Sequence, residues 1–218
     1  MTEPQNIKAA MEAVVRAHSV LADFHREVAA FFRIADDLLA GEDGGVRLEP
    51  APQNAQYAVI ELPVKLVDAA HWAPGWYGRF YRNAEAHRDE QEEGADPALP
   101  EKLAVAFVMV AASPLALADM TTATLPECVA GLAHPGTGRA KDFWTTARYG
   151  VWHLLPFKRI AVEEWREGSF TEGTNVFGKG SYWGARRFPL SDLPDREAIK
   201  SKVTGPLLER FSKRFGGE

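Results

Sequence analysis

One stretch constrains the fold more than any other: PQNIKAAMEAVVRAHSVLADFHREVAAFFRIADDLLAG, at residues 4–41. Its apolar residues and histidines follow one stripe in alternating steps of four and three, and a second apolar stripe runs beside it. This spacing predicts a single amphipathic helix that is capped near Thr2 and ends at Gly41. The first stripe is Ile7, Met11, Val14, His18, Leu21, His25, Val28, Phe32, Ala35 and Leu39, and the second is Ala10, Ala17, Phe24, Phe31 and Leu38.

The predicted helix is long for a chain of this size. About 37 residues, each rising 1.5 Å, give a length on the order of 55 Å, which exceeds the width of a compact domain. Either the helix is kinked, or its overhang pairs with another helix or another chain. Because a sustained 3.5-residue repeat favours helix pairing, we expect a protein partner or self-association through helix 4–41.

The middle of the chain is predicted to contain a sheet. The apolar run LAVAFVMVAAS, residues 103–113, is typical of a strand in the middle of a sheet. Pro63 indicates an edge strand or a bulge for its own segment. The other predicted strands are 45–50, 56–66 and 157–165, and 171–188 is predicted as a hairpin that turns near 178–180.

Helical spacing returns in the segments between and after these strands. A helix is predicted to start at Pro74 and to run to His87, with Trp76, Tyr77, Phe80 and Tyr81 on its apolar side. An acidic loop at 88–100 follows it. The remaining predicted helices are 141–155, 191–203 and a last one that restarts at Thr204-Gly205-Pro206. The sequence thus predicts an α+β fold with a long N-terminal amphipathic helix, a mostly antiparallel sheet and C-terminal helices.

Length and composition bound the number of domains and the compartment. A chain of 218 residues with 46% hydrophobic content predicts a single domain over 1–218. The single cysteine, Cys128, excludes an intramolecular disulfide and a cysteine-based zinc site, which fits a reducing cytoplasm. The N-terminus has no basic leader, and no apolar run approaches the roughly 20 residues of a membrane span. We expect a soluble, cytoplasmic protein without membrane contact.

Charge is distributed unevenly along the chain. Residues 1–138 carry 10 basic and 20 acidic side chains, net −10, whereas residues 139–218 carry 15 basic and 10 acidic side chains, net +5. A basic C-terminal part over 139–218 can engage an acidic partner, either protein or nucleic acid. It can equally neutralise the acidic part of its own fold.

The hexapeptide RNAEAH, Arg82 to His87, is a candidate catalytic motif. It resembles the shortest form of the Arg–polar–x–His motif that lies at a helix end in ribonucleases of the HEPN superfamily. The resemblance implies metal-independent RNA cleavage in which His87 moves protons, Arg82 holds a phosphate and Asn83 orients it. The alternative is that Arg82 and His87 are exposed residues at a helix end, beside an acidic loop that repels phosphate.

Two other groups of residues have a functional and a structural interpretation. His18 and His25 lie about 10 Å apart along one helix, too far to share a zinc ion, and are predicted to be buried, hydrogen-bonded seam residues. Aromatic and arginine side chains between His71 and Arg82 can stack bases and hold phosphates. The alternative is an amphipathic helix with its aromatic residues in the core.

The segment NVFGKGSYWGARR, residues 175–187, is the predicted binding site of the basic part. Glycines allow a close approach there, and cations stand beside aromatic rings. The alternative is an ordinary hairpin with surface cations. The predicted binding residues are Lys179, Tyr182, Trp183, Arg186 and Arg187. No Walker A motif, dinucleotide fingerprint or metal-ligand pattern occurs, so the sequence predicts no cofactor and no metal.

These patterns lead to one principal hypothesis and two alternatives. We expect a non-catalytic binding or assembly subunit that pairs through helix 4–41 and engages an acidic partner through its basic part. The first alternative is a HEPN-like ribonuclease that uses Arg82 and His87. The second is a small-molecule sensor with a tryptophan-lined pocket.

Overall fold

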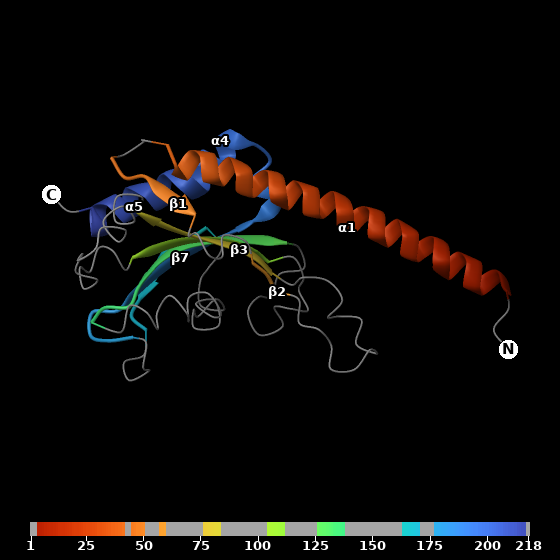
Figure 1. The fold of residues 1–218 in the computed structure, drawn as a ribbon, viewed down its shortest axis with the longest axis horizontal. Helices are drawn as coiled ribbons and strands as arrows, with labels where there is room; N and C mark the ends of the chain where they lie inside the picture. Colours follow the sequence, from red (N-terminus) through yellow and green to blue (C-terminus); the bar gives the residue numbers. More distant parts are fainter. Residues whose placement is uncertain are drawn as a thin grey trace, which may run out of the picture.

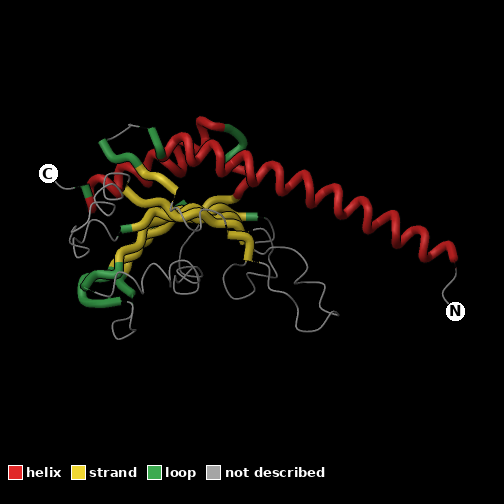
Figure 2. The backbone as a smooth tube through the Cα atoms, viewed as in Figure 1, coloured by secondary structure: helices red, strands yellow, loops and turns green. Residues whose placement is uncertain are grey.

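A long helix and a group of C-terminal helices lie on one face of an antiparallel sheet (Figure 1, Figure 2). The structure is a computed structural model, and it describes residues 4–41, 45–50, 57–59, 76–83, 104–111, 126–137, 163–170 and 177–216. This arrangement confirms the α+β prediction with its N-terminal helix, antiparallel strands and C-terminal helices.

Helix α1, Pro4–Leu39, is one continuous helix of 36 residues. Only its C-terminal part packs on the sheet, where Val28, Phe31, Phe32, Ala35 and Leu39 are buried. Its N-terminal part projects beyond the strands (Figure 1). Of the two predicted alternatives, a kinked helix or an overhang, the chain adopts the overhang.

The sheet contains seven described strands, and every pair is antiparallel. Their order is β1-β3-β4-β5-β7-β6, and β2 also pairs with β3. The strands are β1 Leu48–Pro50, β2 Tyr57–Val59, β3 Trp76–Asn83, β4 Val105–Ala111, β5 Glu127–His134, β6 Arg166–Gly168 and β7 Tyr182–Pro189.

Strand β4 lies in the middle of the sheet, as its apolar run predicts, and it is buried along its whole length. Successive side chains of a strand point to opposite faces, so alternate residues of β4 and β5 face the helices. Those residues are small or aliphatic and form the centre of the core with α1 and the C-terminal helices. They are Ala106, Val108, Val110, Cys128, Ala130 and Leu132.

The C-terminal helices cover the same face of the sheet as α1 (Figure 2). Asp195 caps the N-terminus of α4, because its carboxylate accepts a 2.8 Å hydrogen bond from the Ala198 amide. This confirms the predicted helix within 191–203, but the predicted restart at 204–206 is wrong, because Lys200, Thr204 and Gly205 keep helical dihedral angles and a π-helical turn joins α4 to α5. The elements are η4 Leu190–Asp192, α4 Arg196–Ile199, the π-helical turn η5 Lys200–Thr204 and α5 Gly205–Phe215.

The predicted helix from Pro74 to His87 is wrong for residues 76–83, which form strand β3. Aromatic residues four positions apart, here Trp76 with Phe80 and Tyr77 with Tyr81, also satisfy the two-residue period of a strand, and aromatic side chains favour strands. In β3, Arg79 and Tyr81 face the helices, whereas Phe80 and Arg82 face the opposite side, and all four are buried. The rest of that predicted helix lies outside the described residues.

Several other predicted boundaries differ from the structure. Strand β5 was not predicted, and the strand predicted at 157–165 is not present at Glu163–Trp165, because β6 begins at Arg166. The predicted turn near 178–180 is present, with Gly180 at a φ of 80°. Strand β7 follows that turn and pairs with β6. The predicted helix 141–155 and the acidic loop 88–100 lie outside the described residues.

Candidate interaction surface

The N-terminal half of α1 exposes an apolar stripe to solvent. Ile7, Met11 and Val14 are 55%, 65% and 55% exposed. Farther along the same stripe, Val28 and Phe32 are only 3% and 5% exposed, because the sheet covers them. The stripe is therefore one continuous apolar surface, of which the protein's own core covers only the C-terminal half.

The stripe changes from exposed to buried beside Tyr77 of β3. The ring of Tyr77 lies 5.5 Å from the ring of His25 and 6.2 Å from that of Phe24. The prediction that His18 and His25 are buried is wrong for the single chain, where both are exposed. The sheet does not extend far enough along α1 to cover them.

A polar contact fixes the buried half of α1 on the sheet. Asp36 of α1 forms an ion pair with Arg79 and accepts a 2.9 Å hydrogen bond from the Tyr81 hydroxyl. Burial raises the pKa of Tyr81 well above its ordinary range, and the charge of Arg79 opposes this shift only in part. Tyr81 therefore stays a neutral hydrogen-bond donor, and the three side chains orient α1 against β3.

The predicted binding residues do not share one surface. Strand β7 lies between β5 and β6, so Tyr182 and Arg186 face the helices whereas Trp183 and Arg187 face the opposite side. Tyr182, Trp183 and Arg187 are buried, Arg186 is half-buried, and Lys179, in the turn before β7, is exposed. Binding by these five residues stays a prediction.

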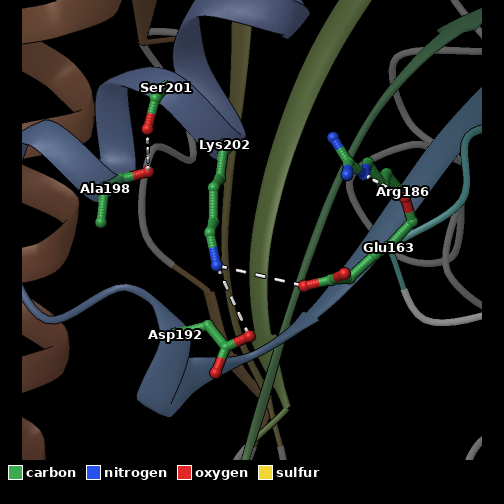
Figure 3. Close-up of polar contacts among 6 residues, drawn as sticks. All are labelled: Glu163, Arg186, Asp192, Ala198, Ser201 and Lys202. Atoms are coloured by element: carbon green, nitrogen blue, oxygen red, sulfur yellow. Dashed lines mark hydrogen bonds and ion pairs between the residues drawn. The ribbon is translucent and has the colours of Figure 1, made fainter.

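Cations of the basic part make contacts within the fold (Figure 3). Lys202 lies 3.5 Å from an Asp192 carboxylate oxygen and 4.0 Å from one of Glu163. Arg186 donates a 2.6 Å hydrogen bond from Nε to the Glu163 carbonyl oxygen. In the same part, Arg210 pairs with Glu167 at 2.9 Å. These partners all lie within 139–218, so the contacts occupy cations of the basic part without neutralising the acidic part of the chain.

Arg187 makes the most buried of these contacts. Its Nε and Nη2 atoms donate to the two carboxylate oxygens of Glu127 on β5, at 3.1 and 2.8 Å. Both side chains are less than 10% exposed, at 8% and 6%. Such a bidentate geometry satisfies both charges away from water, so the pair joins β5 to β7 within the fold.

The RNAEAH motif starts on a strand, not at the helix end that the resemblance to HEPN ribonucleases implies. Arg82 and Asn83 are the last two residues of β3, and Arg82 is buried and opposite Glu49 of β1. His87 lies outside the described residues. The catalytic role of Arg82, Asn83 and His87 therefore stays a prediction.

A hollow of about 430 Å³ lies where the C-terminal end of α1 meets η5 and α5. No tryptophan is among the described residues that line it, so it is not the pocket that the sensor hypothesis predicts. The lining residues are Leu38, Lys200, Thr204, Gly205, Leu208, Glu209, Ser212 and Lys213.

The described residues contain neither a metal-ligand cluster nor a membrane-spanning helix. Within the ranges given above, no three His, Cys, Asp or Glu side chains are grouped so that they could hold a metal ion. In the same part of the chain, no helix has both the length and the apolarity needed to cross a membrane.

Sequence reasoning identified the stripe of α1 but missed the charged contacts beneath it. Asp36 is 43 positions from Arg79, and Glu127 is 60 from Arg187. No local pattern links such residues.

No protein-family model matches the chain, and no curated protein or solved structure matches it either. The exposed stripe is the surface whose geometry best supports a function.

Proposed function

We propose that the protein is a non-catalytic assembly subunit whose exposed half of α1 pairs with another helix. One observation carries this proposal: the stripe that the core buries from Val28 onward continues, in the same register, over the exposed residues Ile7 to Leu21. The stripe keeps the heptad spacing of helices that pack against each other. Its buried half packs on the sheet, and its exposed half has the spacing needed to pack on a partner helix.

The energy available from such pairing is substantial. Burying a valine, leucine, isoleucine or methionine side chain contributes about 1.5–3 kcal/mol. Four such residues, Ile7, Met11, Val14 and Leu21, lie exposed along this one stripe. Soluble monomers rarely leave contiguous apolar patches of this kind uncovered. A helix that projects from its domain also gains little stability without a packing partner.

The other hypotheses gain no support from the described geometry. Engagement of an acidic partner through 139–218 stays a prediction, because Arg186, Arg187 and Lys202 already contact groups of the same chain. The ribonuclease alternative also stays a prediction, because Arg82 is buried in a strand and His87 is not described.

The proposal predicts that Val14→Glu releases the protein from its assembly. A carboxylate in an apolar helix contact is buried without a partner, which should weaken association about 100-fold or more. Val20→Glu is the matched control, because Val20 is also a valine on α1 and is 67% exposed but lies off the stripe. The measurement is native mass spectrometry of tagged chains recovered under mild conditions from the host that makes the protein.

The expected masses are those of a complex for the unchanged chain and for Val20→Glu. Val14→Glu should appear as a free chain of 24.0 kDa. A free unchanged chain, or the same complex with both glutamate variants, would contradict the proposed function.

A further inference from the structure

We infer that the helix which covers the exposed stripe belongs to a second copy of this chain, and that the two helices run antiparallel. The inference rests on the proposed function and names its partner. In the resulting two-fold dimer, the segment from Ile7 to His25 of each chain packs against the same segment of the other, between the two folded domains.

The direction follows from the position of the domain. The exposed stripe faces the same side of α1 as the buried stripe, and the sheet begins beside it at Tyr77. A parallel partner helix would continue past His25 into the space that the sheet occupies, and its own sheet would occupy that space as well. An antiparallel partner instead brings its Ile7 to His25, so that only its first helical turn, from Pro4, continues toward the sheet, and its domain lies beyond Ile7 of the first chain (compare Figure 1).

The spacing of the stripe supports pairing with itself. From Ile7 to His25 the steps are four, three, four, three and four, so the pattern is the same when it is read in either direction. Two antiparallel copies then form six layers in which every stripe residue faces another. Ile7 faces His25, Met11 faces Leu21, and Val14 faces His18, and each pairing occurs twice.

Polar groups are placed favourably in this register. Each imidazole faces an aliphatic side chain, whereas a parallel pair in register would place His18 on His18 and His25 on His25. The charged residues Glu12, Arg16 and Asp23 lie off the stripe. Only Lys8 borders it, and the antiparallel register puts Lys8 opposite Ala22, so no like charges meet across the contact.

Cysteine cross-linking of the purified full-length chain tests both the partner and the direction. Met11→Cys and Leu21→Cys are made as separate single variants, and both positions are exposed, so the fold is undisturbed. The native Cys128 is fully buried in β5 and does not compete. After mild oxidation, we expect a covalent dimer in the mixture of the two variants and none in either variant alone. In the antiparallel register two copies of residue 11 stand about 15 Å apart along the axis, which is beyond the reach of a disulfide.

Two results would overturn the inference. Covalent dimers in each single variant, with no excess in the mixture, would indicate parallel helices. No cross-link in any sample, together with a monomeric mass for the unchanged chain by light scattering, would exclude self-pairing. In either case the proposed function is tested separately. That test is native mass spectrometry of chains recovered from the host, which shows whether Val14→Glu leaves the complex.

Discussion

Replacing Asp36 with alanine is expected to lower the free energy of unfolding by about 3 kcal/mol, because it leaves the charge of Arg79 without its partner in a largely buried site. The side chain of Arg79 is only 11% exposed, and its guanidinium lies over the ring of Phe32 with 5.5 Å between the guanidinium carbon and the ring centre. The Tyr81 hydroxyl loses its acceptor in the same variant. Chemical denaturation with a fluorescence readout measures the loss.

The neighbouring residue Asp37 provides the control. Asp37 is 70% exposed and meets Arg196 at 3.5 Å, so it forms a surface ion pair. Such pairs contribute at most about 1 kcal/mol, and Asp37→Ala should change stability by no more than that. Equal losses for the two variants would show that the contact between Asp36 and the sheet does not fix α1 in the way described.

Replacing Glu127 with alanine should have a still larger effect, about 3–5 kcal/mol. The bidentate contact with Arg187 is lost, and the arginine charge stays in an interior from which water is excluded. A pair of apolar residues of similar volume, Glu127→Leu with Arg187→Met, should recover most of the loss, because it removes the buried arginine charge together with the carboxylate that offsets it.

Thermal and chemical denaturation of three variants tests this second prediction. Asp23→Ala is the surface control, because Asp23 pairs with Arg26 on α1 and both side chains are mostly exposed, at 66% and 76%. Its loss should be at most about 1 kcal/mol. A double variant as unstable as Glu127→Ala alone would mean that side-chain shape, and not the loss of the carboxylate that offsets the Arg187 charge, dominates at this site.

The parts of the fold that follow from local patterns were predictable from sequence. The 3.5-residue repeat of α1 persists from Ile7 to Leu39, and the apolar run of β4 has no polar residue to interrupt it. In β3, by contrast, aromatic residues at 76, 77, 80 and 81 satisfy the helical and the extended period equally. The neighbours that decide between them are β1 and β4, which come from other parts of the chain.

The candidate surface was predictable only in part, for a related reason. The length of α1 predicts that it overhangs, and its repeat predicts which residues form the stripe. The position along α1 at which the stripe changes from exposed to buried depends on Tyr77, because the sheet places this residue beside His25. The contacts of Asp36 and Glu127 bridge 45 and 60 positions to Tyr81 and Arg187, and only the assembled sheet brings these residues together.

Amide hydrogen exchange along α1 tests the central claim most directly, namely that the exposed half of this helix is covered by another helix. It is measured on the assembly isolated from the host and on the Val14→Glu variant. Without a packing partner, a projecting helix frays and its amides exchange rapidly. We predict slow exchange over residues 7–24 in the assembly, rapid exchange there in Val14→Glu, and equally slow exchange over residues 28–39 in both. Equal exchange over residues 7–24 in the two samples would contradict the claim.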